Sequence, residues 1–169
     1  MSIANTLLAE LEQEAQTTQR VLERIPQEHL SWRPHAKSMS LGQLALHVAT
    51  VPGGVAEFAM QDMPSPPGSV QPEAATAAEL VPALAASVAR AKELLGDADD
   101  ATMGKTWRLM NDGREILAMP RAAFLRAIML NHWYHHRGQL SVYLRQLGVA
   151  LPSIYGPSAD ENPFLAQPA

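Results

Sequence analysis

Apolar side chains recur every three or four residues along four separate segments of this chain, and this spacing constrains its fold more than any other feature. A repeat close to 3.6 residues places apolar groups on one face of a helix. Between these apolar positions the first segment carries mainly Glu and Gln, so its helix is amphipathic. The spacing therefore predicts four helices, over residues 2–25, 40–59, 76–96 and 120–147.

Two of these helices begin at sequences typical of a helix N-terminus. Ser40 is followed three residues later by Gln43, and Thr76 by Glu79, and each pair matches a capping box, in which two side chains satisfy free backbone amides. Within the second helix Pro52 is followed by two glycines, and a proline inside a helix removes one backbone hydrogen bond. We expect one bent helix there.

The segments between the helices predict how the helices are connected. Residues 61–75 contain four prolines and form a long irregular crossover, whereas Asp112-Gly113 lies between two short apolar runs in residues 106–117 and indicates a hairpin. Residues 149–169 are too rich in proline to be helical. The chain is accordingly predicted to be a single all-α domain over residues 1–169, a four-helix bundle with one long crossover connection and an irregular tail.

Composition excludes several classes of function. With 47% hydrophobic residues the chain can form a core without disulfides, and with no cysteine it offers no thiolate nucleophile or thiolate metal ligand. Its net charge of −4 argues against nucleic acid as a partner. The acidic start of the chain lacks the features of a secretion signal, and nowhere do about 18 apolar residues follow one another. We expect a soluble cytoplasmic protein with no membrane partner.

Three of the six histidines can meet. His132 and His136 are four residues apart on the predicted last helix, so their imidazoles lie above one another, and His47 lies on the apolar side of the second helix. The alternative for such a pair is two hydrogen-bonded side chains at the protein boundary. Three imidazoles in one apolar bundle would be costly to desolvate without a shared partner, and a divalent ion is the simplest one. Three ligands leave coordination positions free, as in catalytic sites.

Other residues near this predicted site could assist it. Helix phase allows Gln139 to bind a ligand histidine or a water on the metal, and Glu161, in a tail that can fold back, is a candidate acceptor for an imidazole N–H. Imidazole ligands suit several metals, and we expect one divalent ion per chain, zinc or nickel. The sequence identifies no catalytic residue beyond the ligands.

Four stretches of sequence together resemble the DinB-like (DinB/YfiT) family of proposed metalloenzymes. They are Trp32–His47, Met119-Pro-Arg, Asn131–Arg145 with its His-x-x-x-His-Arg-Gly-Gln element, and Pro152–Glu161. The resemblance implies an up-down-down-up bundle, often a homodimer, with a divalent metal on three histidines. Carried over to this chain, the ligands are His47, His132 and His136, and His135 is a neighbour or outer partner of the site, because the family does not require histidine there.

The resemblance also implies a chemistry. Relatives include thiol-dependent S-transferases and a thiol-dependent isomerase, in which the metal activates the thiol of a low-molecular-weight cosubstrate. The first hypothesis is thus an enzyme, which uses its metal as a Lewis acid in thiol-dependent group transfer to a small molecule, or in its hydrolysis. The alternative is a non-catalytic dimeric bundle that holds a metal for stability or acts as a stress-response or interaction module.

Overall fold

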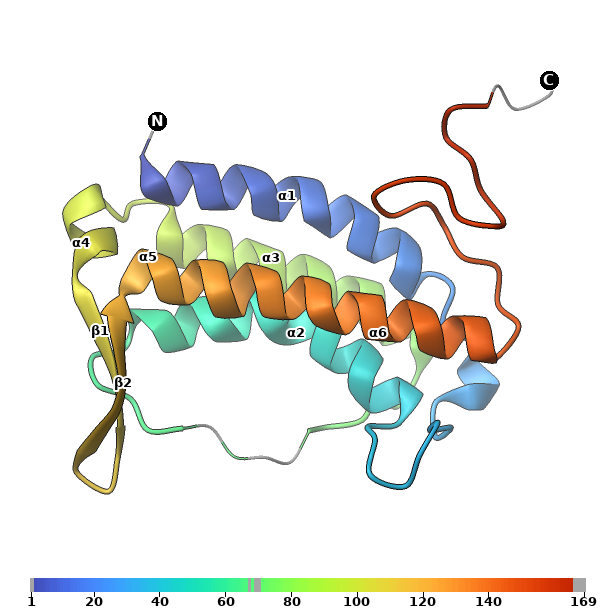
Figure 1. Ribbon diagram of the computed structural model, residues 1–169, viewed down its shortest axis with the longest axis horizontal. Coiled ribbons are helices and arrows are strands. Elements are labelled where there is room, and N and C mark those ends of the chain that lie inside the picture. Colours follow the sequence, from blue (N-terminus) through green and yellow to red (C-terminus); the bar gives the residue numbers. More distant parts are fainter. Residues whose placement is uncertain (1, 67, 69–70, 166–169) are drawn as a thin grey trace.

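The computed structural model describes residues 2–66, 68 and 71–165, and these residues are mostly helical with one small two-stranded sheet (Figure 1). Residue 1, residues 67, 69 and 70 of the predicted crossover and residues 166–169 of the predicted tail lie outside this description. The main elements are α1 (Ile3–Leu22), α2 (Leu41–Met60), α3 (Leu80–Leu95), α4 (Asp100–Gly104), β1 (Thr106–Asn111), β2 (Arg114–Pro120), α5 (Arg121–Phe124) and α6 (His132–Gln146).

The long helices pack alongside one another. Helix α2 contacts α1, α3 and α6, and α1 also contacts α3 and α6. In Figure 1, α1 and the α5–α6 stretch run in one direction, while α2 and α3 both run in the other, because the segment between α2 and α3 returns along the length of the helices. Leucines form the shared core, among them the fully buried Leu11, Leu44, Leu80 and Leu140. Within the described part of the chain, no helix combines the length and the apolar character that crossing a membrane requires.

One of the two predicted capping boxes is confirmed. The Ser40 hydroxyl accepts a hydrogen bond from the Gln43 amide at 3.1 Å, and the Gln43 side chain accepts one from the Ser40 amide at 3.0 Å. The Thr76 side chain makes no such bond, so the second prediction was wrong. A short 3-10 turn over Ala77–Glu79 separates Thr76 from α3, and Glu79 accepts a hydrogen bond from the Ala75 amide instead.

Helix α2 continues through Pro52 as one helix, as its sequence predicts. Its first turns are inclined to the remainder in Figure 1. One turn of α2 lies very close to α3, since a Cβ atom on Gly53 would come within 2.7 Å of the Ser87 carbonyl oxygen. The Gly53 amide donates a hydrogen bond of 2.8 Å to the Ser87 hydroxyl, which itself donates to the Thr50 carbonyl oxygen at 3.0 Å. The Ser87 side chain thus links α3 to the backbone of α2 beside the proline.

Strands β1 and β2 form the hairpin that Asp112-Gly113 predicted. Both turn residues have positive φ, 48° at Asp112 and 77° at Gly113, which matches the two-residue turns that fit the twist of a hairpin. Leu109 pairs with Leu117 and Trp107 with Met119, so one face of the hairpin is apolar. The register shifts between Leu109 and Met110, which leaves Ile116 as the extra residue of a bulge.

The last predicted helix is less regular than its sequence suggests. Pro120 is the final residue of β2 instead of the first residue of a helix. After the short α5, residues Leu125–Asn131 form a π-helical segment, η3, which leads directly into α6. Because a π-helix needs more residues for each turn than an α-helix, the helical phase counted back from His132 does not hold across η3.

Candidate metal centre

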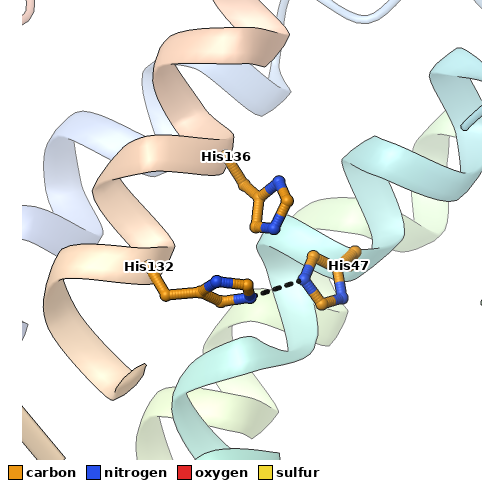
Figure 2. A group of neighbouring side chains, drawn as sticks. All are labelled: His47, His132 and His136. Atoms are coloured by element: carbon orange, nitrogen blue, oxygen red, sulfur yellow. Dashed lines mark hydrogen bonds between the residues drawn. The ribbon is translucent and has the colours of Figure 1, made fainter. Parts of the chain in front are cut away.

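The three predicted ligands come together between α2 and α6 (Figure 2). His132 is the first residue of α6 and His136 lies one turn further, while His47 faces them from α2. The Nε2 atoms of His47 and His132 are 3.2 Å apart, and one possible ligand atom from each of the three rings lies within 4.8 Å of the others. Helix geometry brings two of these imidazoles together, and the packing of α2 against α6 adds the third.

The spacing of the nitrogens suits a single ion. Zinc–nitrogen bonds of about 2.0–2.1 Å in a tetrahedral site place two imidazole nitrogens roughly 3.4 Å apart, close to the His47–His132 separation of 3.2 Å. The rings are nearly perpendicular to one another, with interplanar angles of 87–88°. In Figure 2 the three side chains converge from two helices on a common region. The group could therefore hold a divalent metal.

The electrostatics of the group favour neutral rings. Burial lowers the pKa of His136 to about 4, and the neighbouring histidines contribute to this lowering. Burial also lowers the pKa of His47 and of His132 from the ordinary value. Since a histidine binds metal through a deprotonated nitrogen, these shifts leave the group in its ligand form at neutral pH.

Two glutamines lie against the imidazoles. The Nδ1 atom of His136 is 2.7 Å from the side-chain oxygen of Gln139, so Nδ1–H donates to it and Nε2 remains free for an ion. The helix phase of Gln139 predicted a contact either with a ligand histidine or with a water on the metal, and the structure shows the first of these. Gln71, near the end of the crossover, lines the same cavity as His47, and its side chain opposes the lowering of the His47 pKa. Sequence reasoning missed Gln71, because nothing local indicates that the crossover returns to α2.

Neither of the remaining predicted residues, His135 and Glu161, is a member of the ligand group. His135 is exposed, and its ring centroid is 5.1 Å from that of His136. Glu161 forms an ion pair with Arg20 of α1, and no described contact joins it to an imidazole. The tail crosses α1 at this point. Glu161 therefore lies beside an arginine and not beside a histidine.

Arg137, which follows His136 directly, holds the tail against the helices. It is 1% exposed and forms an ion pair of 2.6 Å with Glu14 of α1. It also donates to the Tyr155 hydroxyl at 2.5 Å, and that hydroxyl donates to Glu14 at 3.0 Å. The guanidinium lies over the rings of Tyr134 and Tyr155, at 5.3 and 5.1 Å from their centroids. Arg137 is thus a structural residue that links the histidine motif to the tail.

A buried hydrogen bond joins α2 to α6 next to the ligands. The Nε1 atom of Trp133 donates to the Val48 carbonyl oxygen at 2.7 Å, and these two residues directly follow His132 and His47. In a regular helix this carbonyl would accept from residue 52, but Pro52 has no N–H. The sequence signal for the free Val48 carbonyl is a proline four residues later, on a helix that also carries a candidate ligand.

A cavity of about 790 Å³ opens onto all three histidines. Its other walls come from apolar side chains of α2, of the α5–η3 stretch and of the hairpin. The ligand group itself contains no carboxylate in the described part of the chain, so protein atoms there fill three coordination positions and leave the cavity side open.

Comparison with known proteins places the chain in a family. The family model described as "DinB family" matches residues 1–164. The uncharacterized protein YrdA of Bacillus subtilis is 28% identical over 157 residues, which cover 88% of this chain and 85% of that protein.

Solved structures agree. A DinB-like protein from Bacillus cereus is 25% identical and superimposes with a TM-score of 0.69 over 88% of this chain and 95% of that one. The DinB-like protein YjoA from Bacillus subtilis, 20% identical, has a TM-score of 0.66 over 88% and 96% of the two chains and shows the same fold. Because the family model matches residues 1–164, nearly the whole chain, the chain belongs to the DinB family.

Proposed function

We propose that the protein is a divalent-metal-dependent enzyme that carries out thiol-dependent group transfer to a small molecule, or its hydrolysis. One observation carries this proposal: three imidazoles converge within 4.8 Å, and a cavity of about 790 Å³ opens onto them. A purely structural site would be expected to close its coordination with a fourth protein ligand, and the described residues of the group supply none.

The side chains at this site have different roles in the proposed reaction. His47, His132 and His136 would hold the ion, and Gln139 fixes the ring of His136 with Nε2 free. A divalent ion bound there supplies Lewis acidity, which lowers the pKa of a bound water or thiol. The apolar walls of the cavity limit the access of water. Because the chain has no cysteine, the thiolate has to come from a cosubstrate.

The transfer step is a nucleophilic substitution at carbon. The thiol of the cosubstrate gives up its proton to solvent, and the sulfur of the resulting thiolate forms a bond to an electrophilic carbon of the substrate. The bond from that carbon to the leaving group breaks, and the leaving group departs with the electron pair.

The finer features of the protein belong to the same proposal. We propose a zinc or nickel ion, one for each chain, and an up-down-down-up four-helix bundle, which the parallel course of α2 and α3 in Figure 1 supports. We also propose that the protein works as a homodimer in the cytoplasm. Light scattering during gel filtration and cell fractionation test these two statements.

Metal analysis of protein purified without a histidine tag tests the metal. The wild type and the variant His135→Ala should carry close to one zinc or nickel ion per chain, whereas His132→Ala should lose it. The neighbouring His135 is a matched control, because it is exposed and outside the ligand group. A wild-type protein that refuses both metals would refute the site.

The reaction is tested separately, with a panel of biological thiols and an electrophile such as 1-chloro-2,4-dinitrobenzene. Chloride release should require both the thiol and an intact ligand group. An equal rate in a variant that lacks all three histidines would remove the metal from the mechanism.

A further inference from the structure

The cavity beside the histidines is large enough for a small molecule. Its volume of about 790 Å³ lies in the range of about 300–1,000 Å³ that is typical of sites for small molecules. Because the cavity is open to solvent, a ligand can enter it and displace water from its apolar walls.

The described residues that line the cavity carry no formal charge. Among the described residues that line it, the only polar side chains besides the three histidines are Thr50 and Gln71. The Thr50 hydroxyl already donates to the Leu46 carbonyl oxygen at 2.8 Å. A charged group placed between these walls would lose its water and meet no counter-charge, which is costly. Polar recognition is thus concentrated at the histidine end.

The hairpin adds apolar surface that its own packing leaves open. Leu109 and Leu117 are cross-strand partners, and both line the cavity. Leu117 is 36% exposed, although it faces this apolar space. Val55 and Phe58 of α2 and Ile128 of the last helical stretch also line the cavity and add to its apolar wall. An apolar occupant would cover these side chains and remove them from water.

We propose that this cavity binds a neutral, apolar small molecule, the electrophile of the transfer reaction, with its reacting end at the three imidazoles. This inference rests on the proposed function. It assigns the two reactants different places: the apolar one lies between α2, the last helical stretch and the hairpin, and a charged thiol cosubstrate does not fit between these walls.

The neutral fluorescent probe N-phenyl-1-naphthylamine tests the class of ligand without requiring a metal. We expect it to bind to metal-free and to metal-loaded protein with micromolar affinity. Leu117→Asp should weaken this binding by about tenfold or more, because it places a charge against the apolar ligand. Ile116→Asp is the matched control, since Ile116 is the neighbouring bulge residue, 53% exposed and not a lining residue, and it should change the affinity by less than about twofold.

Displacement of the probe from wild-type protein tests the orientation and does not depend on any variant. Linear alkyl hydroxamic acids should displace it more strongly from metal-loaded than from metal-free protein, and their affinity should rise about threefold to fourfold with each methylene. The monohydroxamate of adipic acid, which ends in a carboxylate, should bind about tenfold more weakly than hexanohydroxamic acid.

Several results would overturn the inference. They are no binding of the probe, equal effects of the two aspartate variants, no dependence on chain length, or equal displacement from metal-free and metal-loaded protein. Failure of the proposed function is distinct, since it appears in the metal analysis, while the probe still reports on the cavity of the metal-free protein.

Discussion

Replacement of Trp133 by phenylalanine tests whether the bond between α6 and α2 stabilises the ligand region. The Trp133 side chain is 0% exposed, and its Nε1–H donates to the Val48 carbonyl oxygen at 2.7 Å. Leaving a buried acceptor unpaired costs about 1–3 kcal/mol. The smaller ring leaves a void that costs about 1 kcal/mol more. We therefore expect Trp133→Phe to lower the free energy of unfolding by about 2–4 kcal/mol.

Pro52 provides a control that separates the hydrogen bond from the packing. In the variant Pro52→Ala, residue 52 regains an N–H that can donate to the Val48 carbonyl oxygen. In this background Trp133→Phe no longer leaves the carbonyl unpaired, and only the packing loss remains. The cost of the tryptophan substitution should accordingly fall by about 1–2 kcal/mol in the double-mutant cycle.

Urea denaturation followed by circular dichroism measures the four free energies of this cycle. Unchanged m-values would show that each variant unfolds from a comparable native state. If Trp133→Phe costs the same in the wild-type background as in the Pro52→Ala background, the unpaired Val48 carbonyl is not the source of the loss, and the reasoning is refuted.

Three further substitutions test other contacts by the same denaturation assay. Arg137→Met should cost about 3–5 kcal/mol, because it leaves Glu14 buried without its partner; a loss below about 1 kcal/mol would contradict this. Ser40→Ala removes the helix cap of α2 and should lower the free energy of unfolding by about 1 kcal/mol. An unchanged free energy of unfolding would show that the cap does not stabilise the protein. The Arg126 guanidinium lowers the pKa of Glu10, so this pair stabilises the fold above the ordinary carboxyl pKa and loses its effect as pH falls through the lowered one. Glu10→Gln should cost up to about 1 kcal/mol at pH 7 and nothing near pH 2; a pH-independent difference would disprove the assignment.

The sequence was sufficient for several features that short-range geometry decides, although the local pattern Thr76–Glu79 did not form the capping box it predicted. The capping box at Ser40 and the turn at Asp112-Gly113 depend on residues within four positions of one another, and both were predicted. The same holds for the proximity of His132 and His136, which follows from helix geometry alone. The position of His47 required in addition that its helix pack against theirs, which the shared apolar character of both faces indicated.

Contacts between distant segments were harder to predict from the sequence. Glu161 and Gln71 both lie in irregular segments, and no periodicity tells which helix such a segment will cross. The tail brings Glu161 to Arg20, and the end of the crossover brings Gln71 to His47. The bond from Trp133 to Val48 was equally hidden, because a proline inside a helix reports which carbonyl is free but not which distant donor reaches it.

The π-helical segment η3 gives the last helical stretch a straighter wall than a regular α-helix would. Phe124, Ile128, His132 and His136 follow one another at intervals of four residues, and all four line the cavity. In an α-helix each such interval overshoots one turn by about 40°, so four residues at this spacing would drift around the helix. In a π-helix a turn takes more than four residues, so the same interval falls short of a turn. The undershoot within η3 and the overshoot within α6 oppose each other, and one aromatic and one aliphatic side chain consequently share a face with two candidate metal ligands.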